Sequence, residues 1–272
     1  MGWQFIESGR MPPQSIMKKD EALLASLDHT SDPILHLYEW DSPCLTYGYF
    51  TDPLKYLKEE GLKKHGLCTA RRPTGGGIIF HVTDFAFSLL VPAAYPYFSL
   101  NTLENYAYIN QLIIQTISPL IDQNAEPELL KKNDSISKEK PSFCMAQPTQ
   151  YDIVVQEKKL GGAAQRRTKQ GYLHQGSLSL ALPDLELLQD VLKDSQIGEA
   201  MQQCTYSILD ANWSLELLEN TRQIIKSLLI RRLNRIKFSL KNFTRDKSSK
   251  MSHIYHKNGI DAISHFTKFS KI

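Results

Sequence analysis

The chain of 272 residues lacks long hydrophobic runs, an N-terminal leader pattern and paired cysteines. No apolar stretch approaches the roughly 18–20 residues that a membrane-spanning helix needs. The first residues have no basic flank that leads into an apolar segment, so we expect no secretory signal. The chain has only four cysteines, at Cys44, Cys68, Cys144 and Cys204. They form no disulfide framework, and no two of them form a Cys-x-x-Cys pair. With no export signal and no long apolar run, we expect reduced thiols in a cytoplasm and no membrane attachment.

Charge is unevenly distributed along the chain, although the net charge is only +3. Residues 231–272 contain eleven Lys or Arg against two Asp, a net charge of +9. The other 230 residues contain 21 basic and 27 acidic groups and therefore carry −6. We divide the chain accordingly into a large domain over residues 1–232 and a basic tail of unknown fold over 233–272. Such a tail can bind nucleic acid, an anionic membrane or an acidic protein, and a solvated, partly ordered tail is the simpler interpretation.

The distribution of apolar residues predicts a globular domain with both helices and strands. Hydrophobic residues make up 42% of the chain, which excludes a disordered protein. Helices are predicted over residues 15–27, 53–65, 101–122, 183–198 and 214–233. Strands are predicted over residues 34–38, 44–49, 78–92, 151–155 and 176–182. Short strands that alternate irregularly with helices favour a mixed α/β (α+β) fold over a doubly wound parallel sheet.

Three consecutive glycines follow two arginines in the segment from Arg71 to His81, RRPTGGGIIFH. Such a run costs backbone entropy and has little use in a core. It permits a sharp turn and a close approach of backbone N–H groups to an anion or a carbonyl group, to which the arginines can add guanidinium groups. The spacing fits neither the P-loop nor the GxGxxG dinucleotide motif. A ligand-binding loop and a plain structural turn both stay open for this segment.

Two further segments combine a thiol, lysines and glycines. Cys144 precedes the predicted strand 151–155, and a lone cysteine is more often a small core residue than a nucleophile. After that strand come Lys158 and Lys159, then residues 161–165 (GGAAQ), which let the backbone approach another group closely. A lysine beside a thiol lowers the thiol pKa and raises the fraction of nucleophilic thiolate. Because neighbouring residues on a strand point to opposite faces, only one of the two lysines can face a pocket.

In this order and spacing, the three segments resemble motifs of the lipoate–protein ligase and octanoyltransferase superfamily, which shares its catalytic fold with biotin protein ligases. Residues 71–81 are similar to the Arg-Arg-x-Ser/Thr-Gly-Gly loop of that family, and residues 159–167 to its Lys-x-x-Gly-Ser/Ala-Ala-Gln segment. Residues 174–177 are similar to the strand that follows. The resemblance covers about residues 1–215. It implies a mixed-sheet, biotin/lipoate ligase-like catalytic domain within residues 1–232.

The Cys-x-x-x-Pro-Ser/Thr-x-Tyr pattern that begins at Cys144 is similar to that of the cysteine octanoyltransferases. This resemblance implies that Cys144 accepts an octanoyl or lipoyl group as a thioester and that Lys159, fifteen residues later, lowers the pKa of its thiol. It also implies a set of substrate-binding residues: Arg72, Gly75, Gly76, Gly77, Ile78, His81, Gly162, Ala163, Gln165 and His174.

The same resemblance implies the partners of the reaction. Acyl carrier protein supplies the acyl group. A lysine of a lipoyl-acceptor domain, on the glycine cleavage H protein or on a 2-oxoacid dehydrogenase E2 subunit, receives it. No cofactor, metal, nucleic acid or membrane is expected to take part.

Other interpretations stay open. An ATP-dependent lipoate–protein ligase would bind lipoyl-adenylate between the glycine loop and Lys159, would need magnesium, and would leave Cys144 as a bystander. A non-catalytic module that binds acyl-carrier or lipoyl domains is a second alternative. Biotin transfer is a third, and the absence of the glycine- and arginine-rich loop of biotin ligases argues against it.

Overall fold

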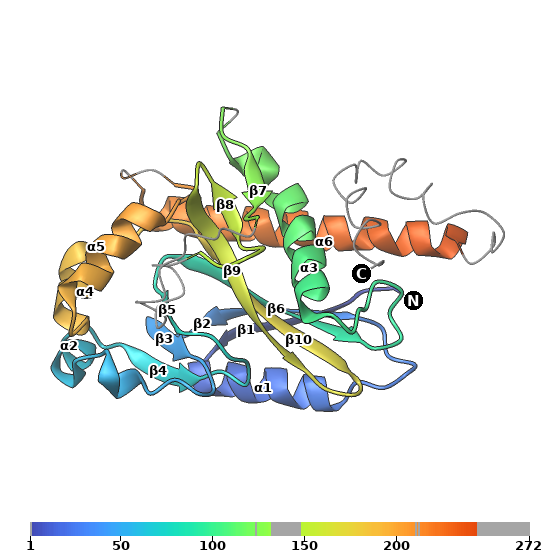
Figure 1. Cartoon of the computed structure of the whole chain (residues 1–272), viewed down its shortest axis with the longest axis horizontal. Coiled ribbons are helices and arrows are strands. Elements are labelled where there is room, and N and C mark those ends of the chain that lie inside the picture. Colours follow the sequence, from blue (N-terminus) through green and yellow to red (C-terminus); the bar gives the residue numbers. More distant parts are fainter. Residues whose placement is uncertain (1, 123, 132–147, 210, 212, 244–272) are drawn as a thin grey trace.

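A computed structural model describes residues 2–122, 124–131, 148–209, 211 and 213–243 of the chain. Two sheets form its centre, as Figure 1 shows. The seven-stranded sheet has the order β1 (Gln4–Met11), β2 (Ile34–Trp40), β6 (Asp84–Pro92), β10 (Gly171–Ser179), β9 (Lys158–Arg167), β8 (Ile153–Val155) and β7 (Pro127–Leu129). The three-stranded sheet has the order β4 (Cys68–Arg71), β3 (Cys44–Tyr47) and β5 (Ile78–His81).

Both sheets mix parallel and antiparallel pairs. Strands β1 and β2 run parallel, as do β3 and β4, whereas the other neighbouring strands are antiparallel. The expected mixed α/β (α+β) fold is therefore confirmed.

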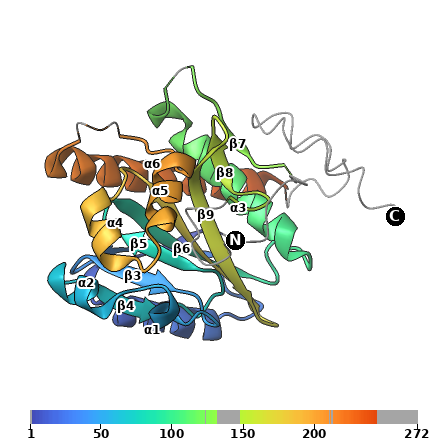
Figure 2. The ribbon, with the colours of Figure 1, turned by 60° about the vertical axis from the view of Figure 1, so that its left-hand side comes forward.

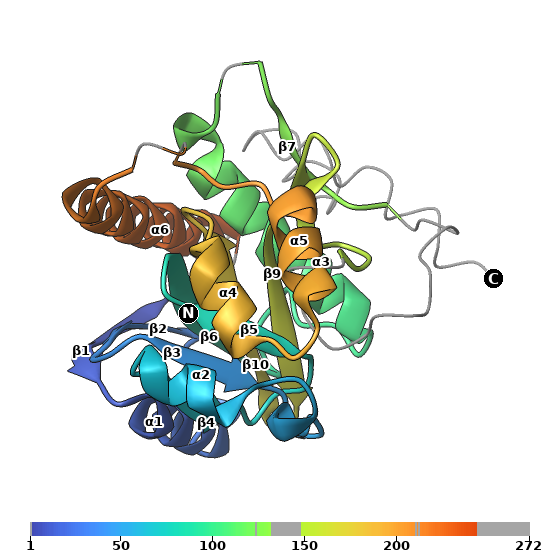
Figure 3. The same cartoon turned by 90° about the vertical axis from the view of Figure 1, so that its left-hand side faces the viewer.

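The described helices surround the two sheets (Figures 1 and 3). They are α1 (Pro13–Ala25), α2 (Glu59–Lys64), α3 (Thr102–Ile117), α4 (Leu185–Val191), α5 (Ser195–Cys204) and α6 (Leu215–Phe243), with 3-10 turns at Pro53–Lys55 and Ser118–Leu120. Helix α1 lies on one side of the strands, and α3 and α6 lie on the other (Figures 1 and 2). Figure 3 shows α2 and α4 beside the three-stranded sheet. None of the described helices is both long and apolar enough to cross a membrane.

Local sequence explains where two of these helices begin. Pro13 occupies the first turn of α1, where its missing N–H leaves no hydrogen bond unmade. Asn101 caps α3, because its side-chain oxygen accepts a hydrogen bond from the Leu103 N–H at 3.0 Å. Glu104 lies in the first turn of the same helix, as its charge predicts.

The main core lies between the large sheet and helices α3 and α6. It joins apolar residues from the whole described chain: Trp3 ahead of β1, Phe85 and Phe87 of β6, Ile109 and Ile113 of α3, and Leu218, Ile225, Leu229 and Leu233 of α6. A second core packs β3 and β5 against α4 and α5. Burial of these faces fixes the register of the strands that carry the candidate site.

Several predicted boundaries were wrong. The strand expected over 176–182 runs instead over Gly171–Ser179, because β10 pairs with β6 along its full length. The helix expected over 183–198 is two helices, since Asp194 caps a new one by accepting from the Gln196 N–H at 3.0 Å. The last helix continues to Phe243 and so crosses the boundary placed at 232. The division of the chain into two parts stays a prediction.

Candidate active site

The glycine loop after β4 is held together by the Arg72 side chain. This guanidinium is buried and donates to the Thr46 Oγ1 at 2.7 Å, the Gly75 carbonyl at 3.1 Å and the Gly77 carbonyl at 2.7 Å. The C=O and N–H of one trans peptide point in opposite directions, so the N–H of Gly76 points away from Arg72. Gly76 is exposed and has a φ of 88°, a conformation that favours glycine. The loop thus turns carbonyls inward and offers a backbone donor outward.

The segment after β3 packs directly against this loop. The Tyr49 N–H donates to the Thr74 carbonyl at 2.9 Å, and the Thr51 hydroxyl donates to the Gly76 carbonyl at 2.9 Å. A Cβ atom at Gly48 would lie 1.9 Å from the Gly76 oxygen, so only glycine fits there. The two segments therefore form one unit at the edge of the site.

Strand β10 connects the glycine loop to the strand that carries the lysine. The Thr74 hydroxyl donates to the Gln175 Oε1 at 2.8 Å, and the Gln175 amide donates to the Asp20 carboxylate at 2.6 Å. Asp20 is buried and also contacts the His36 Nδ1 at 2.7 Å. On the neighbouring strand β9, Ala164 lies opposite Gln175. The glycine loop and the part of β9 around Ala164, about ninety residues apart in the sequence, thus both lie next to Gln175 of β10.

Lys159 lies in a buried ion pair on β9. Its Nζ is 2.7 Å from the Asp152 Oδ2, and both side chains are almost fully buried. Asp152 also accepts from the Thr149 N–H at 2.6 Å and from the Tyr106 hydroxyl at 2.5 Å. Its neighbour Lys158 is exposed, which confirms that the two lysines point in opposite directions. The role of Lys159 in chemistry stays a prediction.

The glycines after Lys159 make room for its side chain. A Cβ atom at Gly162 would lie 2.7 Å from the Lys159 Cε, 2.9 Å from its Nζ and 2.8 Å from the Asp152 Oδ1. The Ala163 N–H donates to the Tyr106 hydroxyl at 2.7 Å, so the strand backbone also supports the tyrosine. Residues 161–165 lie within β9 and pair with β10, although we expected them to follow a strand.

Three of the predicted substrate-binding residues, Ala163, Gln165 and His174, lie on the face of the sheet opposite to that of Gly162. Gln165 and His174 are opposite each other on β9 and β10, with 2.9 Å between the Gln165 Nε2 and the His174 Nδ1. Alternation along β9 places Gln165 on the face opposite to that of Gly162. Burial lowers the pKa of His174 to about 3, so its ring is neutral near pH 7. The His174 ring packs beside Phe87 and Tyr106 on the side of α3.

His81 joins the two sheets through both ring nitrogens. Its Nε2 is 2.7 Å from the Thr46 Oγ1, and its Nδ1 is 2.6 Å from the Asp84 Oδ2. Because Arg72 can only donate to the Thr46 oxygen, the threonine hydroxyl has its proton available for the His81 Nε2. This arrangement leaves the Nδ1–H of His81 to donate to Asp84. Ile78, also predicted to contact substrate, is buried in the second core.

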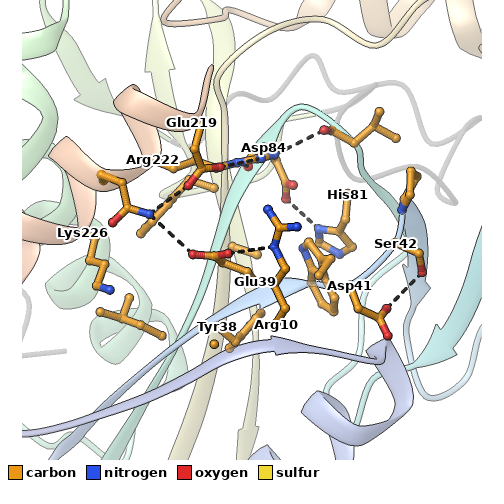
Figure 4. Close-up of a pocket in the computed structure, with 18 of the residues that line it drawn as sticks. Arg10, Tyr38, Glu39, Asp41, Ser42, His81, Asp84, Glu219, Arg222 and Lys226 are labelled. Atoms are coloured by element: carbon orange, nitrogen blue, oxygen red, sulfur yellow. Dashed lines mark hydrogen bonds and ion pairs between the residues drawn. The ribbon is translucent and has the colours of Figure 1, made fainter. Parts of the chain in front are cut away.

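A cavity of about 250 Å³ lies between the ends of β1 and β2 and helix α6, and Figure 4 shows it. His81 and Asp84 border this cavity, whereas Lys159 is not among its lining residues. Its charged groups largely pair with one another, at 3.3 Å for Arg10 with Glu39, 3.6 Å for Arg222 with Glu219 and 2.5 Å for Lys226 with Glu7. We assign no reaction to this cavity and place the candidate active site at Lys159 and the glycine loop.

Sequence reasoning missed two residues of the site and named one that the structure does not describe. Asp152 had a signal, since it follows Cys144 in the segment that resembles the transferases. Tyr106 had none, because it lies among the apolar positions of α3. The predicted nucleophile, Cys144, lies outside the described residues, and its role stays a prediction.

Comparison with known proteins shows the family to which this fold belongs. The model of the lipoyl protein ligase A/B catalytic domain matches residues 12–219. The octanoyltransferase LipM of Geobacillus kaustophilus is 34% identical over 208 residues, which cover 74% of this chain and 73% of that protein. LipM of Bacillus subtilis is 33% identical over 204 residues and covers the same shares.

Solved structures show the same fold. A lipoate-protein ligase A bound with ATP has a TM-score of 0.63 at 23% identity, over 85% of this chain and 84% of that one. The bi-partite lipoate protein ligase of Thermoplasma acidophilum has a TM-score of 0.61 at 22% identity, over 85% and 82%. These likenesses confirm the expected lipoate ligase-like fold. With the family model matching most of the chain, and with relatives above 30% identity, the chain belongs to the lipoyl protein ligase A/B catalytic domain family.

Proposed function

We propose that this chain is an octanoyltransferase of protein lipoylation, which moves an octanoyl or lipoyl group to a lysine of a lipoyl-acceptor domain. Its similarity to LipM octanoyltransferases, 34% identity over 208 residues, is the observation that carries this proposal. The buried ammonium of Lys159 on β9, and a glycine loop that Thr74 and Gln175 join to the neighbouring strand β10, support it, because a fixed cation and backbone donors suit the chemistry of acyl transfer.

In the first step, the Cys144 thiolate attacks the carbonyl carbon of an acyl thioester on acyl carrier protein. A new carbon–sulfur bond forms, and the bond to the carrier's sulfur breaks, so the carrier leaves as a thiolate that takes up a proton. One thioester replaces another, and the exchange therefore needs no ATP. Lys159 is proposed to favour the thiolate of Cys144, since a nearby cation lowers a thiol pKa.

In the second step, the neutral amine of the acceptor lysine attacks the acyl-enzyme. A carbon–nitrogen bond forms, the bond to the Cys144 sulfur breaks, and the proton lost by the amine restores the thiol. Division of the transfer between two steps is the usual advantage of covalent catalysis. Neither step needs a metal or an organic cofactor, and we propose none.

The glycine loop is proposed to stabilise the carbonyl oxygen as it gains negative charge. The outward N–H of Gly76 suits this task, because the Gly75 carbonyl of the same peptide is held by Arg72. One such donor typically lowers the barrier by about 3–4 kcal/mol. The contacts of Arg72 with the loop make it a residue that shapes this site, and its contact with a substrate stays a proposal.

The test is the intact mass of the protein after incubation with octanoyl acyl carrier protein. We expect a gain of one octanoyl group that Cys144→Ala abolishes. Cys68→Ala is the matched control, because this thiol is exposed and lies outside the candidate site. Cys44 is a poor competitor, since burial raises the pKa of its thiol well above the ordinary value.

A parallel incubation with lipoate, ATP and magnesium distinguishes the ligase interpretation. If pyrophosphate is released and an acceptor domain becomes lipoylated even by Cys144→Ala, the chain is a ligase and the transferase proposal is wrong. No mass gain on the wild-type protein and no product in either incubation would contradict both the transferase and the ligase interpretations and leave carrier binding and biotin transfer.

A further inference from the structure

An exposed apolar group lies beside the glycine loop. Phe50 is 92% exposed, and its neighbours Tyr49 and Leu54 are 46% and 51% exposed. The rings of Tyr49 and Phe50 meet edge to face, with 5.1 Å between their centroids. A bound partner would remove these three large apolar side chains from water, which favours binding. Aromatic residues in such interfaces often carry most of the binding energy.

Basic side chains border this apolar group. The Arg71 guanidinium lies 4.7 Å above the centre of the Tyr49 ring. The Lys193 ammonium donates to the Leu54 carbonyl at 2.5 Å, and Lys55 is exposed on the same turn. The nearby carboxylate of Asp52 accepts from the Leu54 N–H at 3.1 Å and so caps the turn. We call Tyr49, Phe50, Leu54, Lys55, Arg71 and Lys193 together the Phe50 surface.

The Phe50 surface is attached to the candidate active site through the backbone. Gly48 touches the Gly76 carbonyl so closely that no Cβ fits, and the Thr51 hydroxyl donates to the same carbonyl. A partner bound at Phe50 is thus held at the rim of the glycine loop. Only a partner whose reacting group is close to its own folded surface needs to dock so near the reaction.

From this geometry we propose that the Phe50 surface docks the acidic folded domain that presents the acceptor lysine. An acceptor lysine reaches only as far as its four-carbon stem, so its domain must bind at the rim. A donor carrier presents its acyl group on a long flexible arm and can bind farther away. The basic border of Phe50 selects for a domain with carboxylates around its lysine, because complementary charge steers encounter. This inference rests on the proposed acyl transfer.

The experiment separates the two steps of the reaction with the full-length protein. Octanoyl carrier protein first loads the enzyme, and the rate of transfer to an acidic lipoyl domain is then measured against the concentration of that domain. We expect Phe50→Ala to raise the half-saturating concentration of the acceptor by about tenfold or more, with the rate of loading unchanged. Leu215→Ala is the matched control, because this exposed leucine at the start of α6 lies outside the Phe50 surface.

A second pair of variants tests the charged border. Lys55→Glu and Lys193→Glu should each weaken binding of the acceptor domain. This loss of affinity should become smaller as salt is added, because salt screens the charges. If wild type and Phe50→Ala have the same half-saturating concentration of the acceptor, the docking proposal is wrong, and the proposed acyl transfer is not affected. A defect confined to loading would mean that the donor binds here instead. Failure of the wild-type protein to load or transfer contradicts the proposed function itself, whatever Phe50 does.

Discussion

The buried ion pair of Lys159 and Asp152 is expected to be essential to the reaction. Lys159→Ala should abolish transfer, whereas Lys158→Ala should leave it nearly unchanged, because only the first side chain is buried in the site. Removal of Lys159 alone leaves a buried carboxylate unpaired, which costs about 3–5 kcal/mol of stability. The double variant Lys159→Met/Asp152→Asn avoids that charge. If the double variant melts near the wild-type temperature but is inactive, the loss of activity is due to the chemistry and not to unfolding. An active double variant would contradict an essential role for Lys159.

The Tyr106 hydroxyl is expected to position Asp152 and strand β9 for catalysis. Tyr106→Phe removes the donor to the Asp152 Oδ1 and the acceptor of the Ala163 N–H, at an expected cost of about 1–3 kcal/mol. We expect a lower kcat with little change in KM. Tyr108→Phe is the control on the same helix, because its hydroxyl contacts the Tyr95 hydroxyl, at 3.5 Å, rather than Asp152. Equal losses of kcat in both variants would show that Tyr106 has no special role.

His174 should make the protein less stable in acid. Burial lowers the pKa of its ring to about 3 when folded, so between pH 3 and about 6.5 the unfolded chain binds a proton that the folded chain does not. Stability attributable to this group is therefore present above about pH 6.5 and falls as the pH drops, by at most about 1.4 kcal/mol per pH unit. Chemical denaturation measures the free energy of unfolding at pH 7 and at pH 5. The decrease between the two should be smaller for His174→Gln than for wild type. The exposed His29→Gln should leave the loss unchanged.

Residues that resemble known motifs were easier to predict than residues that support them. Opposite orientations of Lys158 and Lys159 follow from strand geometry alone, and the structure confirms them. Tyr106 could not be predicted, because an aromatic side chain on an apolar helix face has the same pattern whether its hydroxyl is used or not. Gln165 and His174 illustrate another limit, since alternation assigns Gln165 to the face opposite to that of Gly162 only once residues 161–165 are known to lie within β9.

Strand β9 contains two adjacent glycines with different consequences. At Gly162 an added methyl group would meet the ammonium and the carboxylate of the ion pair, so Gly162→Ala should lower kcat by at least about tenfold. At Gly161 the methyl group would meet the end of the flexible Leu178 side chain, 2.6 Å away, and the Ser177 carbonyl oxygen, 3.1 Å away. Gly161→Ala should therefore cost about 1–3 kcal/mol of stability and retain most of kcat. Kinetics and thermal melting of both variants check this, and a reversed order would contradict it.

Elements with strong local signals were predicted well. Helix α3 begins at Thr102, directly after its Asn101 cap and next to the predicted start at residue 101, because capping depends on neighbouring residues alone. The break between α4 and α5 was missed although Asp194 could have signalled it as a cap. The length of β10 could not be predicted from local sequence, because its pairing with β6 sets that length and joins residues far apart in the sequence.

Chain truncation should distinguish the core from the basic tail. A chain that ends at Arg232 loses Leu233, a buried core residue of α6, and should be destabilised by about 2–5 kcal/mol. A chain that ends at Phe243 keeps all of α6 and loses a segment with six basic and two acidic residues. It should melt like wild type and keep kcat, with a higher KM for an acidic carrier and a weaker dependence on salt. Unchanged KM in the folded protein would exclude a recruiting role for residues 244–272.

The core also has a consequence for how the protein is made. Trp3 packs in the same cluster as Leu218, Ile225 and Leu233, so the first strand and the last described helix share one apolar interior. A ribosome delivers the strands of the large sheet well before α6 exists. Contacts between such distant parts of a chain form slowly, because a long loop must close first. Part of the sheet face that α6 covers therefore stays exposed in the nascent polypeptide from the completion of β10 at Ser179 until α6 emerges, and the yield in cells should depend on chaperones that shield that part.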